Sequence, residues 1–242
     1  MKRRPWILRL AAAAAIVLTA RLGFWQLDRA AHKLALQEQR EQRAHAPPLD
    51  TAALPRTASA ALAAEQRAVV TAGRWLPAHT VYLDNRPMSG RTGFFVLTPL
   101  ELNGGDVLLV QRGWWPRDAA DRARVDAPAP PVDPMQVRGR VALAPSRLFE
   151  LAPDAHGPIR QNLDLAAFQR ETRLPLLPWV LVQTEDAAAP AGDGLSRQWP
   201  EPAADVHKHY GYAVQWFGLS ALVLLLLLWF QIVRPWRRGR TS

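Results

Sequence analysis

The sequence contains no cysteine among its 242 residues, and this absence excludes several kinds of protein. A disulfide framework, a thiolate zinc site, a C-x-x-C redox pair and a covalently attached C-x-x-C-H haem all require cysteine. Methionine is scarce as well, with only three residues, so a soft-ligand copper site is not expected. Any metal chemistry would therefore depend on the six histidines and on carboxylates.

Sequence motifs of common enzyme classes are also missing. There is no G-x-S-x-G nucleophile elbow, no H-E-x-x-H zinc motif and no Walker phosphate loop. Asp84 with Asp106 or Asp118 could be regarded as a carboxylate pair, but nothing in the spacing brings these residues together. We therefore expect the protein not to be an enzyme, and a membrane-tethered hydrolase is the least favoured alternative.

Acidic residues are absent from both ends of the chain, which carry much of its formal net charge of +9. The basic residues there are Lys2, Arg3, Arg4 and Arg9 at one end and Arg234, Arg237, Arg238 and Arg240 at the other. The remaining body has 22 basic and 21 acidic residues and is nearly neutral. This distribution argues against a nucleic-acid partner and is typical of a membrane protein with both ends in the cytoplasm.

The clearest apolar run covers residues 213–233, 21 residues without a charge. A helix of this length spans about 31 Å, close to the thickness of a bilayer core. Trp216 and Trp229 lie near its ends, where tryptophan is enriched in membrane helices. The run predicts a transmembrane helix with a cytoplasmic C-terminus, because four arginines follow it.

A second apolar run covers residues 5–27 and is interrupted by Arg9 and Arg21. Only eleven uncharged residues lie between these arginines, but both side chains can extend to the headgroups from opposite ends. A cleavable signal peptide is the main alternative. Thr19-Ala20-Arg21 is a poor cleavage site, so an uncleaved transmembrane helix is favoured.

These two spans define the expected organisation of the chain and its contact with membrane lipid. We expect a cytoplasmic N-terminus at residues 1–4, a juxtamembrane helix at 28–45, an extracytoplasmic domain at 46–212 and a cytoplasmic basic tail at 234–242. The juxtamembrane helix should continue the first span until Pro47. No Arg- and Ser-rich presequence precedes the first span, which favours a bacterial inner membrane with a periplasmic domain.

The extracytoplasmic domain is expected to be β-rich. Strand-like runs cover residues 68–75, 80–85, 93–102, 107–114, 136–143 and 179–183. Asn103 to Asp106 predicts a hairpin turn, and Asp164 predicts the cap of a short helix over 165–172. The stretch 46–64 is either a linker or a short helix. Six strands and one helix indicate a small barrel or a sandwich.

Two histidines, His207 and His209, lie just before the second span, where they would reach the outer membrane surface. Imidazole beside an aromatic-rich apolar surface suits axial ligation of haem iron. Trp216 and Phe217 could line such a haem, and Arg197 and Lys208 could pair with its propionates. The alternative for these histidines is a polar anchor at the headgroups.

Arg112, Gly113 and Trp114 form a third group of interest, at the end of a predicted strand. Gly113 is expected to adopt a backbone conformation closed to other residues. Trp114 and Trp115 are adjacent in the strand and should point to opposite faces, so that one of them lies outside the core.

Seven short motifs in one order resemble those of the Surfeit locus protein 1 family of cytochrome c oxidase assembly factors. They are GFWQLDRAAHK at 23–33, AGRWLP at 72–77, LDNRPMSGRTGFFVLTPL at 83–100, VLLVQRGWWPR at 107–117, VRG at 137–139 with NLD at 162–164, R-x-W-P at 197–200 and H-x-x-Y-A-x-Q-W-F at 209–217. The residues that match the family's motifs include Trp25, Gln26, Arg29, Asn85, Arg86, Gly90, Gly93, Arg112, Gly113, Trp114, Pro116 and His209. Arg21 departs from the pattern, because that position is usually apolar.

The resemblance implies two membrane helices around an extracytoplasmic domain, and a role in maturing the oxidase subunit that carries haem a. It implies haem, of the a type, as a possible cofactor, with His209 as the ligand of the haem iron. The implied partners are the haem-bearing catalytic subunit of cytochrome c oxidase and haem-synthesis enzymes. The alternative within this reading is a protein–protein scaffold for oxidase assembly that binds no haem.

Overall fold

A computed structural model of the chain describes residues 5–118, 120–121, 124–149, 157–184, 193–199 and 206–233. The expected N-terminal segment 1–4 and the basic tail 234–242 lie outside these residues. The chain divides into two compact units, one formed by Met1–Gln39 with Pro202–Ser242 and the other by Arg40–Glu201.

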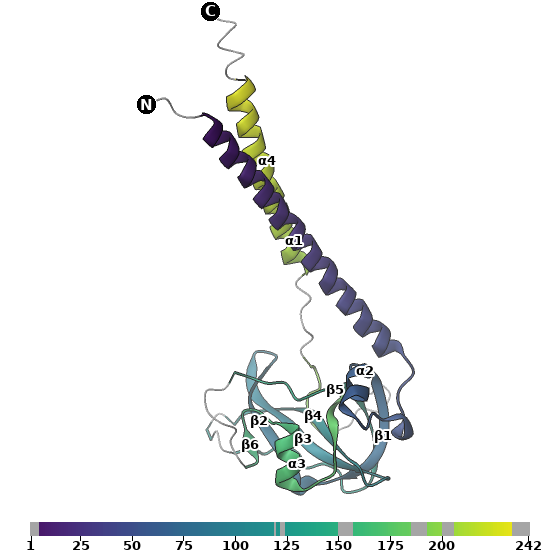
Figure 1. Cartoon of the computed structure of the whole chain (residues 1–242). Helices are drawn as coiled ribbons and strands as arrows, with labels where there is room; N and C mark the ends of the chain where they lie inside the picture. The colour runs from purple at the N-terminus through teal and green to yellow at the C-terminus, as the bar shows by residue number, and fades with distance from the viewer. Residues whose placement is uncertain are drawn as a thin grey trace, which may run out of the picture. The chain divides into compact units, whose positions relative to one another are not determined.

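The first unit is a pair of long helices that lie side by side (Figure 1). Helix α1 covers Pro5–His45, 41 residues, and helix α4 covers Val206–Leu228 and continues into the π-helical turn η3, Trp229–Val233. The helices are antiparallel, because Arg9 near the start of α1 contacts Gln231 in η3, whereas Gln26 further along α1 contacts His209 near the start of α4. As predicted, α1 runs without a break to the residues before Pro47, where proline ends helices.

Both helices are long and apolar enough to cross a membrane. Helix α4 begins at Val206, before the uncharged run that starts at 213, because lysine and histidine are compatible with a helix even where they are costly in lipid. Arg9 does not simply extend to solvent: its guanidinium donates to the side-chain oxygen of Gln231 at 2.9 Å and 2.7 Å. Arg21 is exposed.

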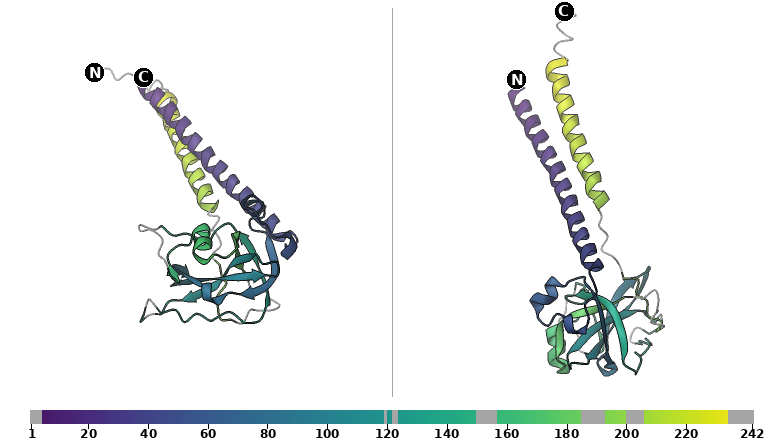
Figure 2. Two further views of the ribbon diagram at one scale, coloured as in Figure 1. Left: turned by 60° about the horizontal axis from the view of Figure 1, so that its bottom comes forward. Right: turned by 90° about the vertical axis from the view of Figure 1, so that its right-hand side faces the viewer.

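The second unit is a closed five-stranded barrel with two further strands attached (Figure 2). Its strands are β1 Ala68–Trp75, β2 Val81–Met88, β3 Arg91–Leu102, β4 Val107–Pro116, β5 Met135–Ala142, β6 Ile159–Arg160 and β7 Leu176–Gln183. They pair in the order β1-β5-β7-β4-β3-β2-β6, and a second pairing of β1 with β3 closes the barrel. The barrel is therefore the correct choice between the two predicted architectures.

Local sequence explains most of these elements. The turn at 103–106 joins β3 to β4 as an antiparallel hairpin, with Gly105 at a φ of 84°. Asp164 caps helix α3, Leu165–Thr172, by accepting from the backbone N–H of Ala167, as predicted. The stretch 46–64 contains the turn η1, Thr51–Ala53, and helix α2, Ala58–Ala63, and a turn η2 covers Pro77–His79.

The apolar core has two parts, on the two faces of the barrel wall. The first part draws on all five barrel strands and fills the interior, with Trp75, Leu108, Val110 and Trp179 among its members. The second part lies on the other face of β2, β3, β4 and β7, beneath Phe168 of helix α3. Strands β3 and β4 are therefore buried on both faces, which explains why they are apolar almost throughout instead of alternating.

Candidate functional site

Three residues from two of the motifs stand in one row across the sheet. Arg86 of β2 lies opposite Gly93 of β3, and Gly93 lies opposite Pro116 of β4. The predicted site residues of the barrel unit thus converge where β2, β3 and β4 meet. The convergence results from strand register, which no single motif specifies.

A β-bulge places Arg86 in the core. The pairing of β2 with β3 passes from Leu83–Phe95 to Arg86–Gly93, so that β2 carries one residue more than β3 in this stretch. Asn85 takes up the extra residue with a left-handed backbone, φ 62°, and remains exposed. A bulge switches the face to which the following side chains point. Arg86 is consequently buried, and its guanidinium lies over the ring of Phe95 at 5.7 Å.

In the described part of the chain, the hydrogen-bond acceptors of the Arg86 guanidinium are a backbone carbonyl and an amide oxygen, not a carboxylate. Its guanidinium donates to the backbone carbonyl of Gln161 at 2.6 Å and to the side-chain oxygen of Asn162 at 3.4 Å. Burial lowers the pKa of Arg86 to about 10, and the charge of Asp84 offsets part of this effect. In return, the indole of Trp114 donates to the backbone carbonyl of Arg86 at 2.8 Å.

A second bulge, in β4, puts Arg112 and Trp114 on opposite faces. The pairing of β3 with β4 passes from Val96–Gly113 to Leu97–Gln111, so that Arg112 is the extra residue. Arg112 is in phase with Leu108 and Val110, which fill the barrel interior, and its guanidinium lies 5.4 Å from the ring centroid of Trp75. Trp114, two residues later, packs in the other part of the core. In a regular strand these two side chains would share one face.

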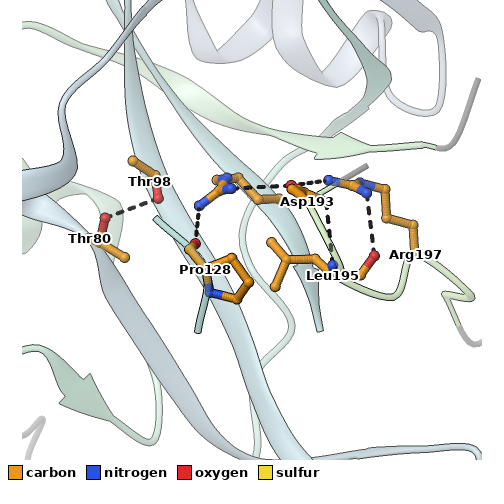
Figure 3. A network of polar contacts seen from close by, with 7 residues as sticks. Thr80, Thr98, Pro128, Asp193, Leu195 and Arg197 are labelled. Atoms are coloured by element: carbon orange, nitrogen blue, oxygen red, sulfur yellow. Dashed lines mark hydrogen bonds and ion pairs between the residues drawn. The ribbon is translucent and has the colours of Figure 1, made fainter. Parts of the chain in front are cut away.

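Arg112, Asp193 and Arg197 form a buried ionic cluster (Figure 3). One carboxylate oxygen of Asp193 accepts from Arg112 at 3.1 Å and from Arg197 at 2.7 Å. The side chains are 1%, 11% and 2% exposed, respectively. Arg112 also donates to the carbonyl of Pro128 at 3.2 Å, and Arg197 to the carbonyl of Leu195 at 3.3 Å. The cluster ties β4 to the segment 193–199.

The charges in this cluster shift one another's pKa values. Burial raises the pKa of Asp193, but the hydrogen bond and charge of Arg197, together with the charge of Arg112, outweigh it and lower the pKa below its ordinary value. Burial lowers the pKa of Arg112, and Asp193 offsets part of this. Burial also raises the pKa of Tyr82, against the charge of Arg112. Asp193 is therefore ionised at neutral pH.

Close approach of neighbouring atoms requires glycine at positions 113 and 93. A Cβ on Gly113 would lie 2.5 Å from the Cβ of Leu195, and one on Gly93 would lie 2.2 Å from the carbonyl oxygen of Trp115. The expectation that Gly113 needs an unusual backbone conformation is wrong, because Gly113 lies in β4 and has no positive φ. The residue lacks space for a side chain, since the segment 193–199 pairs with β4 through Trp114 and Ser196.

The remaining motif residues of the barrel unit shape the same region. Ser89 and Gly90 both have positive φ, at 49° and 76°, and form the tight turn between β2 and β3. Trp114 is buried and Trp115 is half-buried, in agreement with the prediction that only one of the two belongs to the core. Pro116 closes β4 opposite Gly93.

In the helix unit, His209 contacts Gln26. The Nδ1 atom of His209 lies 2.7 Å from the side-chain oxygen of Gln26, across the two helices. Beside them, the ring of Phe217 occupies the space over Gly23, where a Cβ would be 2.7 Å away, and meets Phe24 edge to face at 5.1 Å. A polar contact between apolar helices contributes about 1 kcal/mol to their association.

The predicted haem-site residues belong to two different units. His209, Trp216 and Phe217 belong to the helix unit, where each is half-buried, and His207 is exposed. Phe217 packs between the helices. Arg197 belongs to the barrel unit and is paired with Asp193, so it does not offer a free cation for a propionate. Trp25 and Arg29 are exposed on α1.

Sequence reasoning did not single out Asp193, Phe95 or Trp199. Phe95 meets Trp199 edge to face at 5.2 Å, and the indole of Trp199 donates to the carbonyl of Gln183 at 2.7 Å. Asp193 stands four residues before Arg197, which is a usable signal for that pair. Its contact with Arg112, far away in sequence, has no signal in a single sequence. Within the described residues, no group of three or more histidines and carboxylates could hold a metal ion.

Comparison with known proteins identifies relatives over most of the chain. The profile of the SURF1 family matches residues 13–221. A SURF1-like protein of Rickettsia bellii (strain RML369-C) is 24% identical over 221 residues, which cover 90% of this chain and 88% of the relative. A SURF1-like protein of Rickettsia felis (strain ATCC VR-1525 / URRWXCal2) is 23% identical over 209 residues, covering 85% and 88%. The match includes both helices and the barrel.

Proposed function

Since this chain belongs to the SURF1 family, we propose that it is a non-catalytic membrane factor for assembly of a haem–copper (cytochrome c) oxidase. In this proposal it presents haem a to the catalytic subunit of the oxidase and receives it from the enzymes that make it. The observation that carries the proposal is the family match over both helices and the barrel. The haem-specific part rests on His209.

The residues near His209 suit a haem. The histidine is half-buried at the start of an apolar helix, and its Nδ1 atom is engaged by Gln26. Aromatic side chains on the same two helices are exposed and could face the macrocycle: Phe24, Trp25, Tyr210 and Tyr212. Bound haem would supply an iron that one imidazole nitrogen ligates through its lone pair. A single protein ligand also suits a carrier, which must release its cargo.

The location that we propose is the inner membrane of a bacterium. The two apolar helices would span the bilayer, both termini would be cytoplasmic and the barrel would be periplasmic. We propose no reaction for the protein itself: the buried Arg112–Asp193–Arg197 cluster holds the fold together, and its carboxylate is already bound by two guanidinium groups.

The experiment is a comparison of His209→Ala with His207→Ala, in cells and in the purified full-length chain. His209→Ala should lower haem occupancy by at least about tenfold and reduce the haem content of the oxidase, while its level in the membrane stays normal. His207→Ala is the matched control, because His207 is exposed two residues away and should retain haem.

The scaffold alternative predicts a different outcome of the same comparison. If the purified wild-type chain carries no stoichiometric haem, and His209→Ala leaves the haem content of the oxidase unchanged at an equal protein level, the chain assists assembly through protein contacts alone. The burial of the motif residues Arg86, Arg112 and Trp114 is compatible with this alternative. Because they are buried, these residues stabilise the barrel, and contacts with a partner would use other surfaces.

A further inference from the structure

We propose that Gln26 is a positioning residue for His209, which holds the imidazole in the tautomer that can bind iron. This proposal rests on the proposed function, in which His209 binds haem iron. It adds to that function a second residue, on the other helix, and the tautomer of the imidazole. Its starting point is the contact of 2.7 Å between Nδ1 of His209 and the side-chain oxygen of Gln26.

The chemistry of the two atoms determines where the proton lies. An amide oxygen can only accept a hydrogen bond, so the Nδ1 atom must carry the hydrogen. A neutral imidazole has one N–H, and the other nitrogen then has a free lone pair. In His209 this nitrogen is Nε2, for which the described residues show no hydrogen-bond partner. Iron ligation needs such a lone pair.

The packing of the helices explains why these two side chains meet. Phe217 fills the space over Gly23, which only a residue without a side chain leaves open. Gln26 stands three residues after Gly23, on the same face of α1, and His209 stands eight residues before Phe217, on the same face of α4. The close contact at Gly23 therefore sets the distance at which the glutamine reaches the imidazole.

An acceptor on Nδ1–H does more than orient the ring. It makes the imidazole a stronger electron donor, because the hydrogen bond draws the proton away from the ring. A stronger donor favours ferric over ferrous haem and lowers the reduction potential. The strength of the acceptor at position 26 should therefore set the potential of a haem bound through His209, which a purely structural role for Gln26 would not do.

The test uses the full-length chain in detergent with hemin as the probe. Gln26→Leu removes the acceptor and should lower hemin affinity about tenfold and raise the midpoint potential. Gln26→Glu offers a stronger acceptor and should retain the affinity and lower the potential below that of the wild type. Gln215→Leu is the matched control: it makes the same chemical change at an exposed position of α4 and should leave both quantities unchanged.

A second readout requires no haem. In chains labelled with ¹⁵N-histidine, the ring nitrogens of His209, assigned by their loss in His209→Ala, should report the Nδ1–H form in the wild type. In Gln26→Leu they should report the ordinary mixture of tautomers. An unchanged tautomer in Gln26→Leu, or a potential that does not rank Glu below Gln below Leu, overturns the positioning role.

The two proposals fail in different ways. If hemin binds equally well to the wild type and to His209→Ala, His209 is not the ligand and the haem site proposed at His209 fails. If His209→Ala loses hemin while all the Gln26 variants match the wild type, only the role of Gln26 fails.

Discussion

At the scale of single residues, the barrel unit is defined by arginines that the fold buries. Arg86 relies on backbone and amide oxygens and on an aromatic ring, whereas Arg112 and Arg197 share one carboxylate. A buried charge without a partner costs several kcal/mol, so each arrangement is required once the arginine is inside. These residues therefore explain why the motifs matter for folding, independently of any ligand.

Asp193→Asn should destabilise the protein by about 3 kcal/mol at pH 7, because two buried guanidinium groups would then face each other without a counter-charge. The pKa of Asp193 is lowered in the folded protein, so its stabilisation is fully present above the unfolded pKa of about 3.9. It is lost as the pH falls through the lower folded value. The difference in unfolding free energy between wild type and variant should thus shrink towards pH 3.

Chemical unfolding of the full-length chain, followed by tryptophan fluorescence at pH 7, 5 and 3, measures this difference. The control is Asp133→Asn, since Asp133 is exposed in the loop after β4. Parallel stability curves for wild type and Asp193→Asn across this pH range would show that the cluster contributes no ionic stabilisation.

Gly113→Ala should cost about 2 kcal/mol, because the new methyl group would overlap Leu195 and push the segment 193–199 away from β4. The expected result is a lower steady-state level of the protein and a lower unfolding midpoint. Gly104→Ala is the matched control, as a Cβ there meets nothing within 4 Å. Equal midpoints for the two variants would contradict the close-approach argument.

At the scale of elements, two devices determine what the residues do. Each bulge shifts the alternation of its strand by one: the bulge in β2 buries Arg86, and the bulge in β4 puts Trp114 on the face opposite Arg112. In the helix pair, the less exposed positions recur at alternating spacings of three and four. They include Ala12, Ile16, Thr19, Gly23, Gln26 and Ala30 in α1 and Val206, His209, Ala213, Trp216, Ser220, Val223 and Leu227 in α4. This spacing is the signature of helices packed along one seam.

Gly23→Leu should separate the helices, because Phe217 already fills the space that the leucine needs. Because the chain has no cysteine of its own, the pair Ile16→Cys and Ser220→Cys introduces a single disulfide between the helices. The two positions are close, since the Ser220 hydroxyl donates to the Ile16 carbonyl at 3.2 Å. Adding Gly23→Leu should reduce disulfide formation at least about fivefold, which corresponds to about 1 kcal/mol of helix packing. The measurement is maleimide labelling of the free thiols after denaturation, which should increase. Gly218→Leu, on an open face, should not reduce it. Unimpaired cross-linking in the Gly23 variant would refute this packing.

At the scale of the whole molecule, the barrel domain stands between two apolar helices in chain order, and the distribution of charge predicts the membrane topology. Basic residues flank the first helix on its N-terminal side and the second on its C-terminal side. Cytoplasmic loops and ends are enriched in lysine and arginine. With an even number of spans, both ends should lie on the cytoplasmic side.

Reporter fusions measure this topology directly. Alkaline phosphatase should be inactive when fused after Ser242 and active when fused after Ala187, because the enzyme folds only outside the cytoplasm. A cytosolic reporter at the same two positions should give the opposite pattern. Strong phosphatase activity at Ser242 would overturn the orientation.

The sequence by itself determined the elements. Charge-free runs, proline positions, alternation and the Asp164 cap are local signals, and they predicted α1, six of the seven strands and α3 with close bounds. The two-residue strand β6 was not predicted, since so short a strand exists only through its pairing with β2. The choice between barrel and sandwich also needed the structure, because closure through β1 and β3 joins residues far apart in sequence.

Only the tertiary structure decided which of the predicted residues act together. Arg112 meets Asp193 and Gln26 meets His209 across long stretches of chain, and a single sequence carries no signal for such pairs. The bulges are equally invisible in it, since one extra residue leaves the apolar pattern plausible in either register. The preferences that form helices, turns and caps depend on short stretches of sequence, whereas strand register and helix packing minimise the free energy of the whole chain. For this reason the motifs could be recognised from the sequence, whereas the contacts between them could not be predicted from it.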